Sequence, residues 1–170
     1  MKDIPAEAIL FDMYYMAKDP VALAGEKREL PKVELKPVDE TTPQFRNFHI
    51  SNVYCNGAEK GIFVRGIPEM HVKDIVLENM VLQADKGIDI QEASGISLKN
   101  IKIISKETNP VIDIIQSDKL QFDNISYSDG SELLFRISGD RSNGIRIKNT
   151  DATKAKQSIV YELGATEKAM

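Results

Sequence analysis

The sequence predicts an all-β fold, a parallel β-helix of about five coils that follow an incomplete first coil. One short pattern, with Asn or Asp two residues after an apolar residue, returns every 24 to 27 residues. A second apolar run follows each copy, and the repeats contain no helical stretch. Repeats of this length that hold only short strands are typical of solenoids, whose coils stack along one axis. The recurring positions are Asn47, Asp74, Asn100, Asn124 and Asn149.

The chain divides into four segments within a single domain of residues 1–170. Residues 1–16 form the incomplete first coil, in which Asp3 matches the recurring pattern and residues 7–15 form the second strand. Residues 17–43 predict an inserted loop, because four prolines and a charged middle are incompatible with regular strands. Residues 44–165 hold the regular coils, and residues 166–170 form a tail.

The first coil begins without a polar cap. Repeat proteins need capped ends, because an uncovered end exposes both the core and the edges of strands. We therefore expect the chain to be a truncated part of a longer protein. We also expect self-association through this N-terminal end.

Alternation of apolar and polar residues assigns the faces of the strands. Ile96 and Leu98 are predicted to point inward, and Lys99 outward. Burial of the stacked apolar columns stabilises the fold by roughly 25 cal/mol per Å². The recurring Asn column is predicted at the bends, because Asn tolerates left-handed backbone and bonds neighbouring groups. The second apolar runs are residues 61–65, 87–91, 111–115, 133–137 and 159–163.

Composition excludes several classes of partner. A net charge of −4 gives no electrostatic reason to expect nucleic acid or an anionic membrane surface. The single cysteine, Cys55, allows no intramolecular disulfide, and no apolar stretch is long enough to span a membrane. His49 and His71 fall in different outward columns, so we predict two solvated side chains and no zinc site.

The position before each recurring Asn or Asp is mostly basic. This predicts an outward basic column, which either binds a polyanion or forms a solvated flank neutralised by neighbours such as Glu78. We favour the solvated flank. The column consists of Lys2, Arg46, Lys73, Lys99, Asp123 and Lys148.

Several stretches resemble one known family. Residues 87–90 (Gly-Ile-Asp-Ile) and 94–101 (Ser-Gly-Ile-Ser-Leu-Lys-Asn-Ile) resemble repeats of polygalacturonase-type pectinases, glycoside hydrolase family 28. Residues 1–15, 42–47 and 64–70 resemble the C-terminal part of the Bacteroidetes-type branch of that family. The resemblance covers essentially the whole chain and implies a right-handed, pectin-lyase-like parallel β-helix.

The resemblance implies the C-terminal coils of a glycoside hydrolase that acts on pectic polygalacturonan or a related uronide. Such enzymes hydrolyse by inversion with a general acid and a general base, and need no metal or cofactor. The full-length protein would bind a polysaccharide in a periplasmic or secreted location. A second interpretation is a non-catalytic carbohydrate-binding or structural β-helix module. A pectate lyase would need clustered carboxylates for calcium, which the sequence does not show.

The catalytic motifs of the family are missing. The family places Asn-Thr-Asp directly before a Gly-Ile-Asp-Ile strand, but residues 84–86 are Ala-Asp-Lys. The Asp-Asp position of the next coil falls near residues 109–110 (Asn-Pro), and the following coil has no histidine. Residues 146–151 (Arg-Ile-Lys-Asn-Thr-Asp) join two family motifs in reversed order, which we interpret as a coincidence. We therefore assign no catalytic residue, and we expect the chain alone to be inactive.

One substrate-binding role can be carried over from the family. A tyrosine follows the family's Arg-Ile-Lys motif by about one coil and helps to bind the sugar. Residues 10–14 (Leu-Phe-Asp-Met-Tyr) match that context, so Tyr14 is the predicted substrate-binding residue and Tyr15 the alternative in a one-residue shift of alignment. A tyrosine that simply ends a strand is the competing interpretation.

Overall fold

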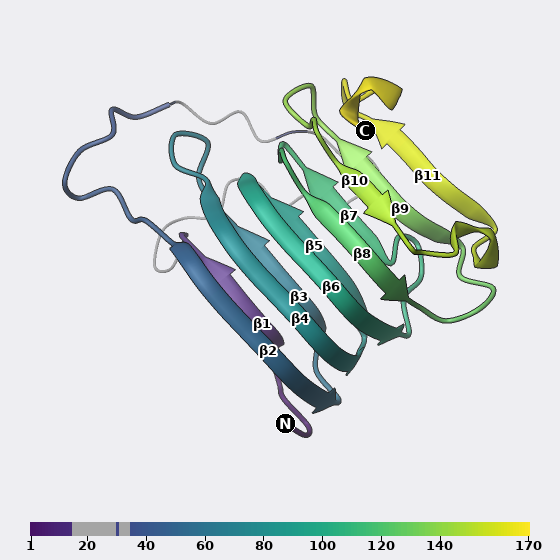
Figure 1. The fold of residues 1–170 in the computed structure, drawn as a ribbon. Helices are drawn as coiled ribbons and strands as arrows, with labels where there is room; N and C mark the ends of the chain where they lie inside the picture. The colour runs from purple at the N-terminus through teal and green to yellow at the C-terminus, as the bar shows by residue number, and fades with distance from the viewer. Residues whose placement is uncertain (15–29, 31–34) are drawn as a thin grey trace.

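The structure, a computed structural model, describes residues 1–14, 30 and 35–170. Two parallel β-sheets face each other, and consecutive strands alternate between them (Figure 1). This is the predicted β-solenoid of about five turns. The larger sheet has the order β1 (Glu7–Asp12), β3 (Lys60–Arg65), β5 (Lys86–Gln91), β7 (Ile112–Ile115), β9 (Leu133–Ser138) and β11 (Gln157–Glu162). The smaller sheet has the order β10 (Arg146–Lys148), β8 (Gln121–Ser126), β6 (Ala93–Ser105), β4 (Val72–Ala84) and β2 (Arg46–Asn56).

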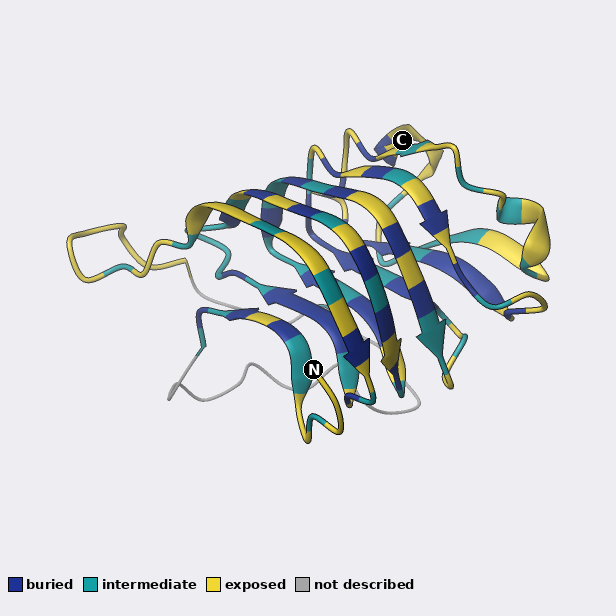
Figure 2. Cartoon of the chain, turned by 60° about the horizontal axis from the view of Figure 1, so that its bottom comes forward, coloured by how far each residue is buried: buried dark blue, intermediate teal, exposed yellow. Residues whose placement is uncertain are grey.

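The core lies between the sheets and is built from stacked apolar columns. Buried and exposed residues alternate along the strands of the smaller sheet (Figure 2). Ile96 and Leu98 are buried as predicted, and they pair in register with Ile75 and Leu77 of the preceding coil. In the larger sheet the columns continue with Ile62, Ile88, Ile112 and Phe135, all at most 1% exposed.

A column of asparagines runs along the smaller sheet, but three of the residues predicted for it, Asp3, Asn47 and Asp74, lie outside it. The column consists of Asn52, Asn79, Asn100, Asn124 and Asn149, all with φ between 49° and 60°. The side-chain amide of Asn100 donates to Asn79 at 2.9 Å, and that of Asn124 donates to Asn100 at 2.9 Å. Asn47 and Asp74 instead share a second left-handed column with Gly95.

The error has a simple cause. In β2 and β4 the pattern occurs twice, five residues apart, so Asn47 and Asn52 match it equally well, as do Asp74 and Asn79. The structure selects the second copy because Ile75 and Leu77 must stack on the inward column of β6, which aligns Asn79 with Asn100. Burial of apolar columns, and not the Asn pattern, therefore sets the register.

The predicted basic column also separates, and Lys2 pairs with Asn56, apart from the other members. Arg46 pairs in register with Lys73, whereas Lys99 lies between Glu78 and Asp123. In the second column the charges alternate in sign along the solenoid, with Lys148 beside Asp123. This arrangement agrees with the solvated flank and not with a continuous polyanion-binding stripe.

The two ends of the solenoid differ. Phe48 of β2 continues the inward column of Ile75, yet it is 43% exposed while Ile75 is fully buried. At the other end two short 3-10 segments follow, η1 (Ala152–Lys154) and η2 (Glu167–Ala169), and Ala169 is buried against the core. The segment expected as a tail thus contains η2. Most of the predicted loop of residues 17–43 lies outside the described residues.

Candidate functional site

A third column of left-handed residues lies where the strands of the larger sheet end and the chain turns toward the smaller sheet. It holds Glu92 (φ 47°), Gln116 (φ 47°), Gly139 (φ 91°) and Leu163 (φ 53°), which follow strands that are aligned in register. A residue with a side chain costs about 1–2 kcal/mol in this conformation, and Asn or Gly costs less. Glu92 and Gln116 therefore occupy positions that the backbone disfavours for them. Strain of this kind marks the corner as a candidate site.

Two glycines allow the corner to pack this closely. A Cβ atom on Gly139 would lie 2.4 Å from Cδ of Gln116, and a Cβ atom on Gly66 would lie 2.1 Å from the backbone oxygen of Glu92. Neither contact is possible for a residue with a side chain. The Gln116 side chain consequently lies across the next coil at Gly139.

A hollow of about 290 Å³ opens at this corner. It combines one aromatic ring with cationic, anionic and carboxamide groups, so it can offer both a stacking surface and directional hydrogen bonds. Its lining includes Tyr14, Arg65, Gln91, Glu92, Gln116 and Arg141.

Tyr14 lies in this hollow, directly after β1. Its backbone N–H donates to Oδ1 of Asp12 at 2.9 Å, and the guanidinium carbon of Arg65 lies 5.0 Å from the centre of its ring. Arg65 in turn holds Asp12 with two bonds, Nε to Oδ1 at 2.9 Å and Nη2 to Oδ2 at 2.6 Å. The predicted residue Tyr14 is thus fixed beside a cation, while Tyr15 lies outside the described residues.

The electrostatic surroundings keep the Tyr14 hydroxyl protonated. Burial raises the pKa of Tyr14 above its ordinary value, and the negative charges of Glu92 and Glu69 raise it further. The guanidinium of Arg65 acts in the opposite direction without cancelling these effects. At neutral pH the group is therefore a neutral hydroxyl that can donate or accept a hydrogen bond.

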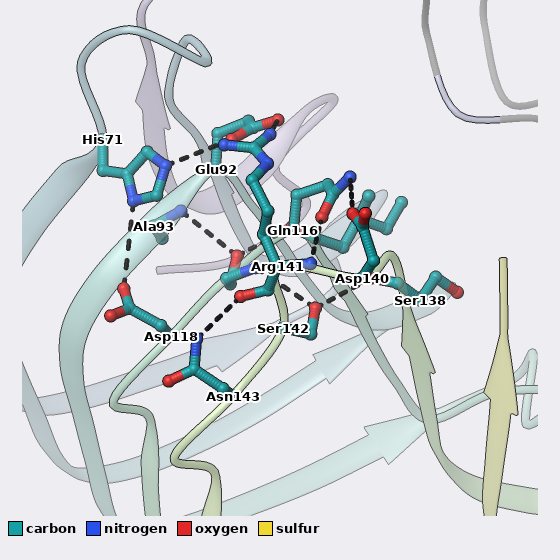
Figure 3. A network of polar contacts seen from close by, with 12 residues as sticks. His71, Glu92, Ala93, Gln116, Asp118, Ser138, Asp140, Arg141, Ser142 and Asn143 are labelled. Carbon is teal, nitrogen blue, oxygen red and sulfur yellow. Dashed lines mark hydrogen bonds and ion pairs between the residues drawn. The ribbon is translucent and has the colours of Figure 1, made fainter. Parts of the chain in front are cut away.

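Four successive turns meet in a polar network beside the hollow (Figure 3). Nη2 of Arg141, from the turn between β9 and β10, donates to Oε1 of Glu92 at 2.5 Å. On the other side of that carboxylate, Nε2 of His71 lies 3.2 Å from Oε2. Nδ1 of His71 lies 3.9 Å from Oδ1 of Asp118.

The His71 side chain is only 25% exposed. The prediction that His71 is a solvated surface residue was wrong, because coil stacking places it between two carboxylates.

A second, wider hollow of about 710 Å³ lies next to the first. Pro68 and Arg141 line both hollows, so Arg141 stands at their junction. The second hollow is polar and carries charges of both signs. Its other lining residues include His71, Lys73, Asp118, Lys119 and Asn143.

The positions that would match the family's catalytic motifs lie elsewhere. Lys86 begins β5, and Glu132 directly precedes β9, so both stand at the N-terminal ends of strands whose C-terminal ends form the hollow. The Arg146–Lys148 segment is β10 of the smaller sheet, and Asp151 caps η1 by accepting from the backbone N–H of Thr153 at 3.1 Å. The fused motif therefore has a local structural role.

The comparisons with known proteins leave the family open. Neither the protein-family models, nor the curated proteins, nor the solved structures give a match to this chain. Within the described residues, no helix is long and apolar enough to cross a membrane. The described part of the chain also contains no group of three or more His, Cys, Asp or Glu side chains that could hold a metal ion.

Sequence reasoning missed Glu92, Gln116 and Arg141. Glu92 and Arg141 are 49 residues apart in the sequence and meet only because their coils stack, with the turn of Gln116 between them. The sequence did contain a usable signal. Glu92 and Gln116 occupy the same position in successive coils, directly after an apolar run. A turn is expected there, and turns favour Gly or Asn. A long polar side chain at such a position is unusual enough to predict a role for it.

Proposed function

We propose that this chain forms the C-terminal coils of a glycoside hydrolase that acts on pectic polygalacturonan or a related uronide by inverting hydrolysis. On its own, the chain binds the polysaccharide without cleaving it. The motifs that resemble family 28 suggest the substrate. The observation that carries the proposal is the hollow lined by Tyr14, Arg65 and Arg141, in which the ring of Tyr14 lies beside the guanidinium of Arg65.

The aromatic ring and the guanidinium group of the hollow suit an acidic sugar. An aromatic ring packs against the apolar face of a sugar, and its hydroxyl can bond a sugar hydroxyl. A guanidinium group matches the planar carboxylate of a uronate with two parallel hydrogen bonds. The volume of about 290 Å³ is close to the lower end of ligand pockets, about 300–1,000 Å³. A single sugar ring of a longer chain fits such a space.

The same geometry argues against hydrolysis by this chain. Inverting hydrolysis requires one protonated carboxyl group and one carboxylate, separated by about 6.5–9.5 Å. At this hollow Asp12 is held by two bonds from Arg65, and Glu92 is bonded to Arg141. Both carboxylates are therefore already engaged by arginines. These carboxylates position other groups.

A non-catalytic carbohydrate-binding module is the second candidate function. The pairing of the carboxylates with arginines favours it, because every feature described above serves recognition. Both candidates predict the same behaviour of this chain, and they differ only in whether the full-length protein cleaves the polymer.

The proposal is tested by measuring binding and cleavage with the same preparation. Isothermal titration calorimetry with trigalacturonate should show binding that weakens in Tyr14→Ala. Release of reducing sugar from polygalacturonate should stay at the background level. Absence of binding would overturn the proposal. Cleavage that disappears in Asp151→Asn would show that the fused motif is catalytic after all.

A further inference from the structure

We infer that Arg141 is the residue that receives the carboxylate of the bound uronide, and that Glu92 and Gln116 are its positioning residues. This inference rests on the proposed function, because it specifies how the same hollow selects an acidic sugar. The residues matched to family motifs do not include any of the three. The assignment comes from the contacts of the corner alone (Figure 3).

The backbone of Arg141 is fixed on both sides. Its N–H donates to Oε1 of Gln116 at 3.0 Å, and its carbonyl oxygen accepts from Nδ2 of Asn143 at 2.9 Å. Nε2 of Gln116 donates to Oδ1 of Asp140 at 3.4 Å. A turn held in this way presents its side chain in one direction, which lowers the entropy lost on binding.

The guanidinium of Arg141 is anchored at one point and otherwise open. Nη2 bonds Oε1 of Glu92, and the side chain is still 44% exposed. Within the described residues, no other bond to this guanidinium is seen. A guanidinium carries five N–H donors, so donors remain for a ligand. Arg65 differs, because its side chain is only 17% exposed and binds Asp12 with two bonds.

Two of the strained residues of the corner hold Arg141. Glu92 and Gln116 both have a φ of 47°. Glu92 bonds the guanidinium of Arg141, and Gln116 bonds its backbone. Asn or Gly at either position would relieve the backbone strain. Neither has a side chain long enough to reach Arg141. Glu92 and Gln116 are thus held against backbone preference at the two positions that contact Arg141.

His71 completes the arrangement from the opposite side. Its Nε2 lies beside Oε2 of Glu92, which leaves Oε1 to Arg141. The Glu92 side chain is 14% exposed and lies between His71 and Arg141, and its hydrogen bond is to Arg141. Since Arg141 lies at the junction of the two hollows, a polymer that runs from one to the other passes its guanidinium.

The test compares an acidic sugar with its neutral counterpart. Affinities for trigalacturonate and for α-1,4-galactotriose are measured by calorimetry with wild type, Arg141→Gln, Arg141→Lys and Glu92→Gln. The matched control is Arg146→Gln, which removes an exposed arginine from the smaller sheet. A charge-assisted hydrogen bond contributes about 1.5–3 kcal/mol, so Arg141→Gln should weaken trigalacturonate binding at least about tenfold. Galactotriose binding should change less than about twofold, since it has no carboxylate.

Arg141→Lys should lie between wild type and Arg141→Gln, because a lysine keeps the charge but loses the planar fork. Glu92→Gln should cause a smaller loss, again confined to trigalacturonate. If wild type does not bind trigalacturonate, the proposed function and this inference both fail. If wild type binds and Arg141→Gln binds equally well, or loses both sugars equally, the carboxylate assignment alone fails. An unchanged Glu92→Gln would overturn the positioning role.

Discussion

Replacement of Asn100 by alanine tests the asparagine column most sharply. Asn100 has a φ of 53° and lies in the middle of the column. Its amide donates to Asn79 and accepts from Asn124, each at 2.9 Å. The substitution removes both bonds and leaves alanine in a left-handed conformation. Both effects destabilise the folded state.

The magnitude follows from these two contributions. The bonds are exposed, so each contributes about 0.5 kcal/mol, the lower end of the usual range. Alanine in the left-handed conformation costs about 1 kcal/mol. Asn100→Ala should therefore lower the free energy of unfolding by about 2 kcal/mol, which corresponds to a fall in Tm of about 4–8 °C. Asn47→Ala should lose only about half as much, because Asn47 is also left-handed but bonds no other described side chain.

Urea unfolding followed by circular dichroism measures these differences. Lys102→Ala is the matched control, because Lys102 is an exposed residue of the same strand. It should change stability by less than about 0.5 kcal/mol. If Asn100→Ala costs no more than Lys102→Ala, the column does not stabilise the solenoid. If Asn47→Ala costs as much as Asn100→Ala, the register described above is wrong.

Three further predictions concern the corner and the N-terminal end. Gly139→Ala should lower the unfolding free energy by at least about 2 kcal/mol. The new Cβ would lie 2.4 Å from Cδ of Gln116, and residue 139 has a left-handed backbone that disfavours alanine. Thermal unfolding measures this change. Burial raises the pKa of Tyr14 above 10.0, so its contribution to stability is fully present below pH 10 and lost as pH rises further. Tyr14→Phe should flatten that decline in urea titrations above pH 10, and an unchanged slope would contradict it. The partly exposed edge at β2 should cause self-association, which light scattering detects. Ile50→Lys should reduce this self-association. A wild type that stays monomeric at high concentration would contradict the prediction.

The solenoid could be predicted because its signals are local. Alternation of apolar residues and a repeat of 24 to 27 residues identify strands and coils without knowledge of which coils touch. The register of neighbouring coils was harder, since Asn47 and Asn52 fit the same pattern. Only the stacking of Ile75 on Ile96 decides between them.

The candidate site was predictable only in part. Tyr14 was singled out from its sequence context and it lines the hollow, while its sugar-binding role stays a prediction. Arg141, Glu92 and His71 lie in three different turns, and each is an ordinary polar residue when considered alone. Their meeting depends on the number of residues in each coil, which small shifts in register change. For that reason the same error that displaced Asp74 also hid the surroundings of His71.

The most direct test of the account is a titration of the ¹⁵N-labelled chain with trigalacturonate, followed by NMR. The account predicts that shifts of the amide signals concentrate at the corner, at Gly66, Glu92, Gln116 and Arg141, while the signals of the asparagine column do not move. An absence of shifts, or shifts centred on the smaller sheet around Asn100, would contradict the claim that this corner binds an acidic polysaccharide.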